Sequence, residues 1–423
     1  MIEHEGRVTR AWVLHPELKT VSGRRDPVAA LAEATSLARA LPELDAVGAT
    51  VIGLKKLLPG TLFGSGKLTE LKEIFEEHNV ELVLLDGHVT PVQQRNLEKK
   101  WGVKLLDRTA LILEIFSDRA STREGVLQVE MAALGYQRTR LVRAWTHLER
   151  QRGGLGFVGG PGETQIEADR RAIDDQLLRL RRQLDKVVKT RALHRAARAK
   201  VPFPIVALIG YTNAGKSTLM KALSGSNVFI QDQLFATLDT TIRAVEIDKS
   251  HTILLSDTVG FIRKLPHNLV ASFRSTLKEV IESDLILIVL DSSNEYIDDH
   301  IKTITSVLDD IGAKNLTQIV LNKIDLIKSK SRFEFLKNLF PDGIYVSALD
   351  QLRLDSLKKS ITKAMDKDRI VTELKLPYDR PKQIAFSQKD VEIIKRDYKD
   401  DHIFLKIRGS AKRIDQIKIM VKK

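Results

Sequence analysis

The sequence lacks two features that mark secreted and membrane proteins. It has no cysteine among its 423 residues, which excludes disulfides and thiolate metal sites. Residues 1–5 are acidic overall and no long apolar run follows them, so we expect neither a signal peptide nor a transmembrane helix. These absences predict a cytosolic protein with no membrane partner.

The sequence also has fewer acidic than basic residues. The chain has 68 Lys and Arg against 55 Asp and Glu, a formal net charge of +13. Such an excess predicts a polyanionic partner, with nucleic acid favoured over a membrane surface, and leaves a generally solvated basic surface as the alternative. The length is too great for a single core and predicts two or three domains.

A glycine-rich phosphate loop is the first motif that points to a chemistry. The apolar run at residues 205–209 precedes Gly210, Tyr211, Thr212, Asn213, Ala214, Gly215, Lys216, Ser217 and Thr218. A strand, this loop and a helix in succession wrap backbone N–H groups around phosphates. In that setting the Lys216 ammonium reaches the β and γ phosphates, and the Ser217 hydroxyl ligates Mg²⁺.

A second motif follows the strand-like residues 253–255 and consists of Asp257, Thr258, Val259 and Gly260. Asp257 is expected to face the metal at the end of its strand and to act through a Mg²⁺-bound water. The Gly260 N–H is expected to contact the γ-phosphate, a contact that is lost on hydrolysis and therefore couples chemistry to loop position.

A third motif predicts the base. Asn322, Lys323, Ile324 and Asp325 follow an apolar strand at residues 319–321. The Asp325 carboxylate can accept from both N1–H and N2–H₂ of guanine, whereas adenine offers no such pair. The Lys323 stem can lie over the base. The three motifs together predict GTP as the substrate, with Mg²⁺ as cofactor.

Two weaker segments complete the predicted pocket. Between the first two motifs, a switch loop is expected to comprise Phe235, Ala236, Thr237, Leu238 and Asp239. Thr237 is the predicted ligand of Mg²⁺ and the γ-phosphate, with Thr240 and Thr241 as alternatives. Ser347, Ala348 and Leu349 are expected to place a backbone N–H at the guanine O6. The predicted catalytic residues are Lys216, Thr237 and Gly260, and the predicted metal ligands are Ser217, Thr237 and Asp257.

The residue after Gly260 is Phe261, and Ile262 follows it. Many Ras-like switches have glutamine at the first of these positions, where it orients the attacking water. Neither Phe261 nor Ile262 can do so. Because supplied catalytic groups are worth roughly 10³–10⁵ in rate, the chain is predicted to depend on a partner for useful turnover. A plain packing role for Phe261 is compatible with this prediction.

Strand-like and helix-like segments alternate over residues 1–123. Strands are predicted at 7–15, 46–54, 80–86 and 103–107, and helices at 27–41, 67–78 and 92–101. This alternation predicts a small parallel α/β domain. Gly60, Gly64 and Gly66 flank one of its loops, for which a plain turn is favoured over a second nucleotide site.

Residues 124–200 are rich in helix formers and arginine, with a glycine-rich interruption at 153–162. Apolar residues recur at heptad spacings in both halves, at Leu127, Met131, Leu134, Leu141, Trp145 and Leu148, and at Ile173, Leu177, Leu180, Leu184 and Val187. Two such seams predict an antiparallel helical hairpin with a mobile tip. The second helix is expected to begin at residues 163–165.

This hairpin carries the residues predicted to bind RNA, which are Arg150, Arg152, Gly160, Gly162, Arg170, Arg171, Arg179 and Arg182. The arginines would hold phosphates while the tip enters a cleft. The alternative is a solvated helix face with a flexible linker.

The remaining residues form two further predicted parts. Residues 201–366 contain the nucleotide motifs and are expected to form a GTPase domain. Residues 367–423 are Lys-rich, with strand-like residues 403–407 and helix-like residues 411–420. The predicted fold is therefore an α/β class chain: a parallel α/β domain, a helical hairpin, a P-loop GTPase domain and a small α+β domain. We expect a monomer.

The motifs resemble those of the HflX family of ribosome-associated GTPases. The likeness spans about residues 5–365 and is carried by residues 153–171, 210–218, 235–239 and 257–266. The resemblance implies binding to the large ribosomal subunit and its RNA, and separation of stalled ribosomes into subunits.

The sequence departs from the family pattern in three places. Val158 and Gly159 stand where many members have arginine before the tip motif, which puts a tip contact through that charge in question. Thr240 replaces a common proline. Residues 350–353 replace the glycines expected after Leu349, so the loop near the guanine is expected to be stiffer or differently shaped.

Three functions compete at this stage. The first is a GTPase that acts mechanically on ribosomes. The second is a signalling switch that uses the hairpin to bind a protein effector, which the basic hairpin disfavours. The third is an RNA-binding or ribosome assembly checkpoint without subunit separation. The likeness of the tip motif favours the first over the third.

Overall fold

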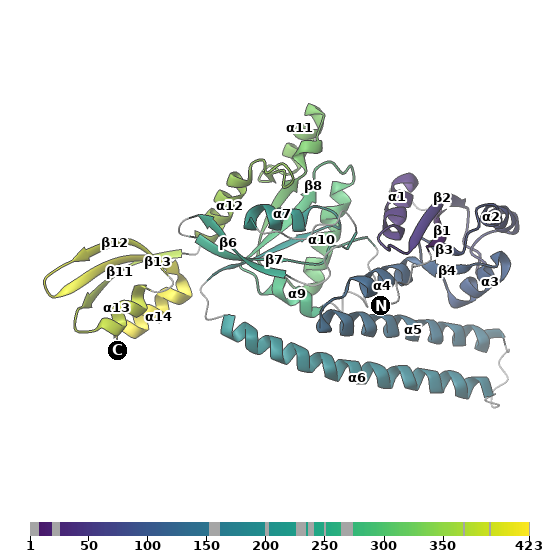
Figure 1. Ribbon diagram of the computed structural model, residues 1–423, viewed down its shortest axis with the longest axis horizontal. Coiled ribbons are helices and arrows are strands. Elements are labelled where there is room, and N and C mark those ends of the chain that lie inside the picture. The colour runs from purple at the N-terminus through teal and green to yellow at the C-terminus, as the bar shows by residue number, and fades with distance from the viewer. Residues whose placement is uncertain are drawn as a thin grey trace, which may run out of the picture.

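The computed structural model describes residues 8–18, 26–151, 161–198, 203–225, 234–235, 241–248, 251–263, 274–366, 369–388 and 391–422. Three sheets and one long helical hairpin follow one another along the chain (Figure 1). Within the described residues, no helix combines the length and the apolar character needed to cross a membrane.

The first sheet is parallel, with strand order β2-β1-β3-β4. Its elements are β1 (Thr9–Leu18), α1 (Pro27–Ala38), β2 (Leu44–Leu54), α2 (Ser65–Glu77), β3 (Leu82–Leu85), α3 (Pro91–Trp101), β4 (Lys104–Asp107) and α4 (Arg108–Arg119). The predicted parallel α/β arrangement is confirmed.

Helix α4 was not predicted from the sequence, because no turn separates it from the preceding strand. Asp107 is the last residue of β4 and also the N-cap of α4, where its side chain accepts from the Ala110 N–H at 2.9 Å. A carboxylate at this position satisfies one of the unpaired N–H groups that begin a helix. One residue thus ends the strand and starts the helix.

The hairpin consists of α5 (Arg123–Gln151) and α6 (Pro161–Arg198), which lie side by side and antiparallel (Figure 1). Leu127 and Leu180 of the predicted seams are buried. The second helix begins at Pro161, two residues before the predicted start, because proline is well tolerated in the first turn of a helix. Most of the predicted tip, residues 153–160, lies outside the described residues, as do the side chains of Trp145 and Leu148.

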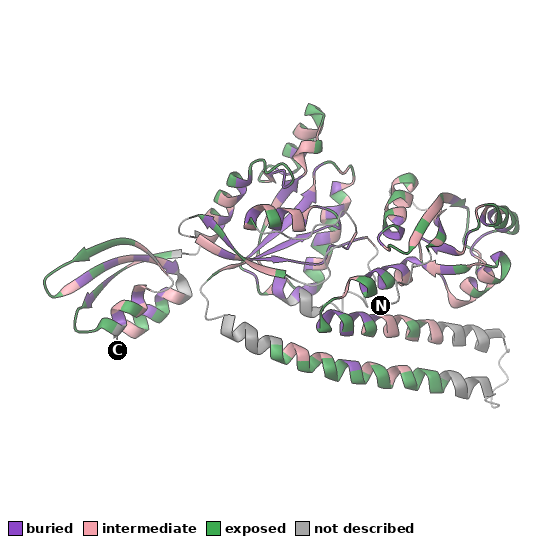
Figure 2. Cartoon of the chain, in the orientation of Figure 1, coloured by how far each residue is buried: buried purple, intermediate pink, exposed green. Residues whose placement is uncertain are grey.

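The predicted GTPase region is a six-stranded sheet in the order β10-β9-β8-β5-β7-β6, in which only β6 is antiparallel to its neighbour among the described strands. Its elements are β5 (Ile205–Gly210), α7 (Lys216–Ser224), β6 (Thr241–Asp248), β7 (His251–Asp257), α9 (Arg274–Ile281), β8 (Leu285–Asp291), α10 (Ile297–Ile311), β9 (Leu316–Asn322), α11 (Lys330–Leu339), β10 (Ile344–Tyr345) and α12 (Leu354–Asp366). Figure 2 shows that its central strands are almost entirely buried, as expected for parallel strands covered on both faces.

The last region is a three-stranded antiparallel sheet in the order β11-β13-β12. It comprises β11 (Arg369–Pro377), α13 (Pro381–Gln388), β12 (Glu392–Tyr398), β13 (His402–Ser410) and α14 (Ala411–Lys422). Both helices lie on the same face of the sheet (Figure 1) and share a small apolar core with it.

Candidate nucleotide-binding site

The three predicted motifs meet at one edge of the six-stranded sheet. Strand β5 ends at Gly210, β7 ends at Asp257 and β9 ends at Asn322. These strands are parallel members of the sheet, so their carboxyl ends lie at the same edge. Ligands of open α/β sheets bind at this edge.

The phosphate loop has the conformation that its glycines predict. Gly215 has φ +86° and precedes α7, and a Cβ atom added to it would lie 2.3 Å from Asn322 Nδ2. A Cβ added to Gly210 would lie 2.3 Å from the carbonyl oxygen of Val289. Both positions therefore require glycine, and the first N–H groups of α7 face the loop.

Lys216 is buried and lies inside this loop. Its ammonium donates to the carbonyl oxygens of Gly210 at 3.2 Å and Tyr211 at 3.0 Å. Burial lowers the pKa of Lys216 to about 8, and the nearby charge of Asp257 opposes that shift. A buried cation of this kind favours an anionic ligand, because the ligand's charge offsets the loss of hydration.

Ser217 and Asp257, two of the three predicted metal ligands, are brought together by the fold. The Ser217 hydroxyl donates to Asp257 Oδ2 at 2.7 Å, and Asp257 is buried. Hydroxyl and carboxylate oxygens are the donors that Mg²⁺ prefers. The two side chains therefore fit a magnesium site beside the phosphate loop.

Gly260 and Phe261 connect the second motif to the phosphate loop. A Cβ on Gly260 would lie 2.9 Å from Thr212 Cγ2 and 3.1 Å from Lys216 Nζ. The Phe261 N–H donates to the Gly210 carbonyl at 3.0 Å, and the Thr212 N–H donates to the Phe261 carbonyl at 2.7 Å. A shift in the second motif is thus transmitted directly to the backbone around the phosphates.

The side chain of Phe261 is 2 % exposed and packs in the core between the sheet and α10. This confirms the packing role for Phe261. Its ring is apolar and enclosed, so it cannot orient a water molecule.

Asn322 forms two side-chain hydrogen bonds at the end of the site where guanine is predicted to bind. Its Nδ2 donates to the Ala214 carbonyl at 2.9 Å, and its Oδ1 accepts from the Ala348 N–H at 2.9 Å. The side chain therefore joins the phosphate loop to the segment that begins at Ser347. The Ala348 N–H is occupied by this bond, and the Ser347 N–H donates to the Leu352 carbonyl at 3.2 Å. Of the three predicted residues, this leaves the Leu349 N–H as the candidate donor to guanine O6.

Lys323 and Asp325 lie where the guanine base is predicted to bind. Lys323 has φ +61°, and its ammonium pairs with Asp291 at 2.8 Å. Asp325 Oδ1 is buried and has no hydrogen-bond partner in the part of the chain that the structure describes. A buried carboxylate oxygen requires donors, and the N1–H and N2–H₂ groups of guanine would supply them in the role predicted for Asp325.

The loop after Leu349 shows why its departure from the family pattern is tolerated. Gln351 and Arg353 adopt φ values of +55° and +59°. These left-handed conformations favour glycine, and other residues adopt them at a cost of about 1–3 kcal/mol each. The loop thus keeps a glycine-like backbone with longer side chains.

The predicted switch loop is described only in part. Ala236, Thr237, Leu238 and Asp239 lie outside the described residues, so the Thr237 ligand stays a prediction. Thr241, one of the alternatives, is the first residue of β6 and donates to Met220 Sδ at 3.7 Å. Phe235 is 2 % exposed, and its ring meets Phe116 of α4 edge-on at a centroid distance of 4.7 Å. Its side chain thus belongs to a contact between domains.

Tyr211 of the phosphate loop is held by the first domain. Its hydroxyl donates to Glu33 of α1 at 3.0 Å and accepts from the Arg263 N–H at 2.8 Å. Burial, together with the Glu33 charge, raises the pKa of Tyr211, so the hydroxyl stays protonated and can donate. The ring stacks on His300 at a centroid distance of 3.8 Å.

Arg108 of α4 completes this contact. It donates to Glu33 and to Asp86 at 2.6 Å each, and to the Arg263 carbonyl at 3.1 Å. Sequence reasoning missed Arg108 and Glu33. The available signal was weak, since neither residue belongs to a recognisable motif and the two are 75 positions apart in the sequence. The N-terminal domain therefore forms hydrogen bonds both with Tyr211 of the phosphate loop and with Arg263, which follows the second motif.

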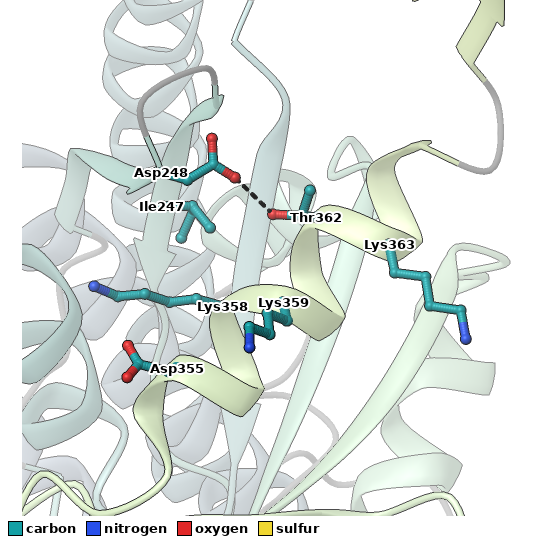
Figure 3. Close-up of a pocket in the computed structure, with 7 residues that line it drawn as sticks. All are labelled: Ile247, Asp248, Asp355, Lys358, Lys359, Thr362 and Lys363. Carbon is teal, nitrogen blue, oxygen red and sulfur yellow. Dashed lines mark hydrogen bonds between the residues drawn. The ribbon is translucent and has the colours of Figure 1, made fainter.

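A cavity of about 340 Å³ lies between α1 and the phosphate loop, lined in part by Ala29, Ala32, Glu33, Thr212 and Asn213. A second cavity, of about 720 Å³, lies between β6 and α12, and its lining includes Asp248, Thr362 and three lysines (Figure 3). Among the residues that the structure describes, none of the predicted nucleotide residues lines the second cavity.

The predicted RNA-binding residues are placed only in part. Arg170, Arg171, Arg179 and Arg182 are exposed along α6, and the first two pair with carboxylates of the same helix, Asp174 at 4.0 Å and Glu167 at 3.6 Å. Gly162 is in the first turn of α6. Arg152, Gly160 and the side chain of Arg150 lie outside the described residues.

Comparison with known proteins gives matches along most of the chain. Three family models match in succession: "GTP-binding GTPase N-terminal" at residues 28–117, "GTP-binding GTPase Middle Region" at 119–198 and "50S ribosome-binding GTPase" at 205–323.

The chain is 46% identical over 345 residues to the GTPase HflX of Magnetococcus marinus, covering 81% of this chain and 80% of the relative. It is 41% identical over 321 residues to the GTPase HflX of Escherichia coli, covering 75% of each chain. A solved structure of a GTP-binding protein from Sulfolobus solfataricus in complex with GDP is 22% identical and covers 84% of this chain and 98% of that chain, with a TM-score of 0.45.

Proposed function

This chain belongs to the HflX family of GTPases, and on that premise we propose that it binds the large ribosomal subunit and separates stalled ribosomes into subunits. The proposal is supported above all by the match of residues 205–323 to a model described as a 50S ribosome-binding GTPase. Those residues include the phosphate loop, Asp257 and Asn322.

GTP is the substrate of the reaction, and Mg²⁺ is its proposed cofactor. A bound Mg²⁺ would supply positive charge beside the phosphate oxygens as negative charge develops on them. Ser217 and Asp257 would hold it. Lys216 orients the phosphates through its buried ammonium, and Asp325 selects guanine. Gly260 holds the second motif against the phosphate loop, where a γ-phosphate would meet its N–H.

The ribosome is proposed to bind the hairpin. Arg179 and Arg182 are exposed on α6, where phosphates of ribosomal RNA can reach them. The arm is long because α6 alone has 38 residues, about 57 Å at 1.5 Å per residue. An arm of that length can carry its tip far from the GTPase domain.

The test is sedimentation of intact ribosomes with the purified chain and GTP, GDP or a non-hydrolysable GTP analogue. The proposal expects the chain to travel with the large subunit and the intact ribosome peak to fall in the presence of GTP. Binding without any loss of intact ribosomes would instead support an assembly or RNA-binding checkpoint factor. Failure to bind would contradict both.

A further inference from the structure

The C-terminal sheet has two different faces. In its central strand β13, Ile403, Leu405 and Ile407 are buried against α13 and α14. Successive side chains of a strand point to opposite faces. The residues between them therefore point away from the helices, and these are His402, Phe404, Lys406 and Arg408. This second face is called the open face below.

Phe404 is at the centre of the open face and is 40% exposed. It is paired with Lys375 in β11 and with Asp397 in β12. The His402 ring meets it edge-on at a centroid distance of 4.6 Å, and the Lys375 ammonium lies 5.9 Å from its ring centre. The apolar core of the domain lies on the other face, so Phe404 presents a flat ring to solvent among charged neighbours.

The charge around this ring suits a polyanion. Residues 367–423 contain 16 Lys and Arg against 9 Asp and Glu, a net charge of +7 within a chain total of +13. On the open face, Lys406 pairs with Glu373 at 3.0 Å and Lys395 pairs with Asp397 at 3.9 Å. These pairs are largely exposed and hence weak. Phosphates can therefore replace the carboxylates at little cost.

We propose that the open face binds single-stranded RNA, with one base stacked on Phe404 and the neighbouring phosphates held by Lys375 and Lys406. Sheets that present aromatic rings on an exposed face are a common platform for single-stranded RNA. Stacking tolerates any base, because every base has a flat face. A partner protein that docks by apolar contacts fits less well, because charges surround the ring.

This proposal goes beyond the GTPase reaction and the hairpin. The stacking surface is argued from the C-terminal sheet alone, and only the choice of RNA over DNA rests on the proposed ribosomal function.

The first test measures the affinity of the full chain for a fluorescent 12-nucleotide uridylate RNA by anisotropy. Phe404→Ala is expected to weaken binding at least about fivefold, the loss typical of one stacked base. Phe404→Trp should restore it, whereas Phe404→Leu, which keeps the bulk but not the flat ring, should not. A 12-base-pair RNA duplex should bind all four proteins alike. Stronger binding of the matching DNA strand would overturn the choice of RNA.

A charge-matched pair of variants separates a specific site from general attraction. Lys375→Ala with Lys406→Ala removes two cations from the open face, and Lys359→Ala with Lys363→Ala removes two from the cavity beside α12 (Figure 3). We expect a clearly larger loss of single-stranded RNA binding from the first pair. Equal losses would overturn the proposal in favour of unspecific electrostatics.

Because the exposed arginines of α6 can also attract RNA, a second readout localises the contact. The same RNA carrying 5-iodouridine is cross-linked to the full chain by light and the attached peptide is identified. Attachment at residues 402–408 supports the proposal. Attachment only elsewhere, or unchanged affinity of Phe404→Ala, overturns it. Neither result depends on ribosome splitting, so this proposal and the proposed function can fail separately.

Discussion

Two side chains at the nucleotide site, Asn322 and Asp325, have different roles. Asn322 uses both of its polar ends on the protein itself, at Ala214 and Ala348. Asp325 keeps a buried oxygen with no partner among the described residues. The first residue therefore holds the pocket together, and the second is the one available to the base.

Asp325→Asn is expected to shift the base preference from guanine towards xanthine. The amide can no longer accept from both guanine donors, and hydrogen bonds to a charged group are worth about 1.5–3 kcal/mol, or roughly a tenfold or greater loss of GTP affinity. Competition binding with GTP, XTP and ATP measures this. Asn322→Ala serves as the contrast, since it should lower stability and affinity without making xanthine the preferred base. An unchanged preference for GTP in Asp325→Asn would remove Asp325 from the base site.

Arg108 is the residue on which the contact between the first domain and the phosphate loop depends. It is 6 % exposed and pairs with Glu33 and Asp86. Arg108→Ala leaves two carboxylates without their cation, and removal of one partner from a buried pair costs about 3–5 kcal/mol. We expect a correspondingly lower free energy of unfolding in urea.

A matched control for Arg108 is available on the hairpin. Arg138 pairs with Asp174 at 2.8 Å, but both side chains are about two-fifths exposed, at 42% and 41%. Exposed pairs contribute about 0–1 kcal/mol. Arg138→Ala should therefore lower stability by about 1 kcal/mol or less. Similar losses in the two variants would show that Arg108 is not a buried anchor.

At the scale of elements, the hairpin is stabilised by one apolar stripe on each helix. Leu180 is 7 % exposed and Leu178, two residues away on α6, is 49% exposed. Leu180→Ala is expected to cost about 2–5 kcal/mol, the usual range for a buried leucine. Leu178→Ala should cost far less. Hydrogen exchange of the hairpin amides reports the difference locally, and equal effects would contradict the predicted seam.

The same hairpin predicts two separable defects in ribosome experiments. Replacing Arg179 and Arg182 with alanine should weaken ribosome binding and flatten its salt dependence, because fewer counterions are released. Deleting residues 153–162 should leave much of that binding intact and abolish subunit separation. GTP affinity, measured in parallel, should not change in either variant. If the deletion variant splits ribosomes at the normal rate, the tip is only a linker.

At the scale of the whole molecule, two features of the GTPase domain bear on hydrolysis. The residue after Gly260 cannot orient the attacking water, and the N-terminal domain contacts the loops around the phosphate site. Phe261 is enclosed in the core, and Glu33 and Arg108 hold the segments around Tyr211 and Arg263. Any partner that completes the catalytic site acts on loops already tied to another domain. We therefore expect GTP hydrolysis and the position of the N-terminal domain to be coupled.

GTP hydrolysis by the isolated chain is expected to be slow and to rise at least about tenfold with large ribosomal subunits, since supplied catalytic groups are worth roughly 10³–10⁵ in rate. Single-turnover rates with large subunits, small subunits and no subunits measure the effect. Small subunits control for unspecific RNA. Equal rates in all three would mean that the chain contains its own orienting group.

The sequence alone determined those parts of the protein that depend on local spacing. The phosphate loop, Asp257 and Asn322 each follow an apolar strand, and parallel strands bring their ends to one edge whatever the rest of the chain does. Heptad spacing in the same way predicted the hairpin and its buried Leu180. Such features repeat over a few residues, so they are visible without coordinates.

Only the tertiary structure decided which distant side chains meet. Tyr211 and Glu33 are 178 positions apart, and Phe235 and Phe116 belong to different domains. No local period encodes such pairs, because they arise from how whole domains pack. The same holds for the two side-chain hydrogen bonds of Asn322, since its motif did not show that it would join Ala214 to Ala348. It also holds for Phe404. Strand alternation predicts which residues of β13 share a face of the sheet with Phe404, but only the packing of the helices decides which face stays open to solvent.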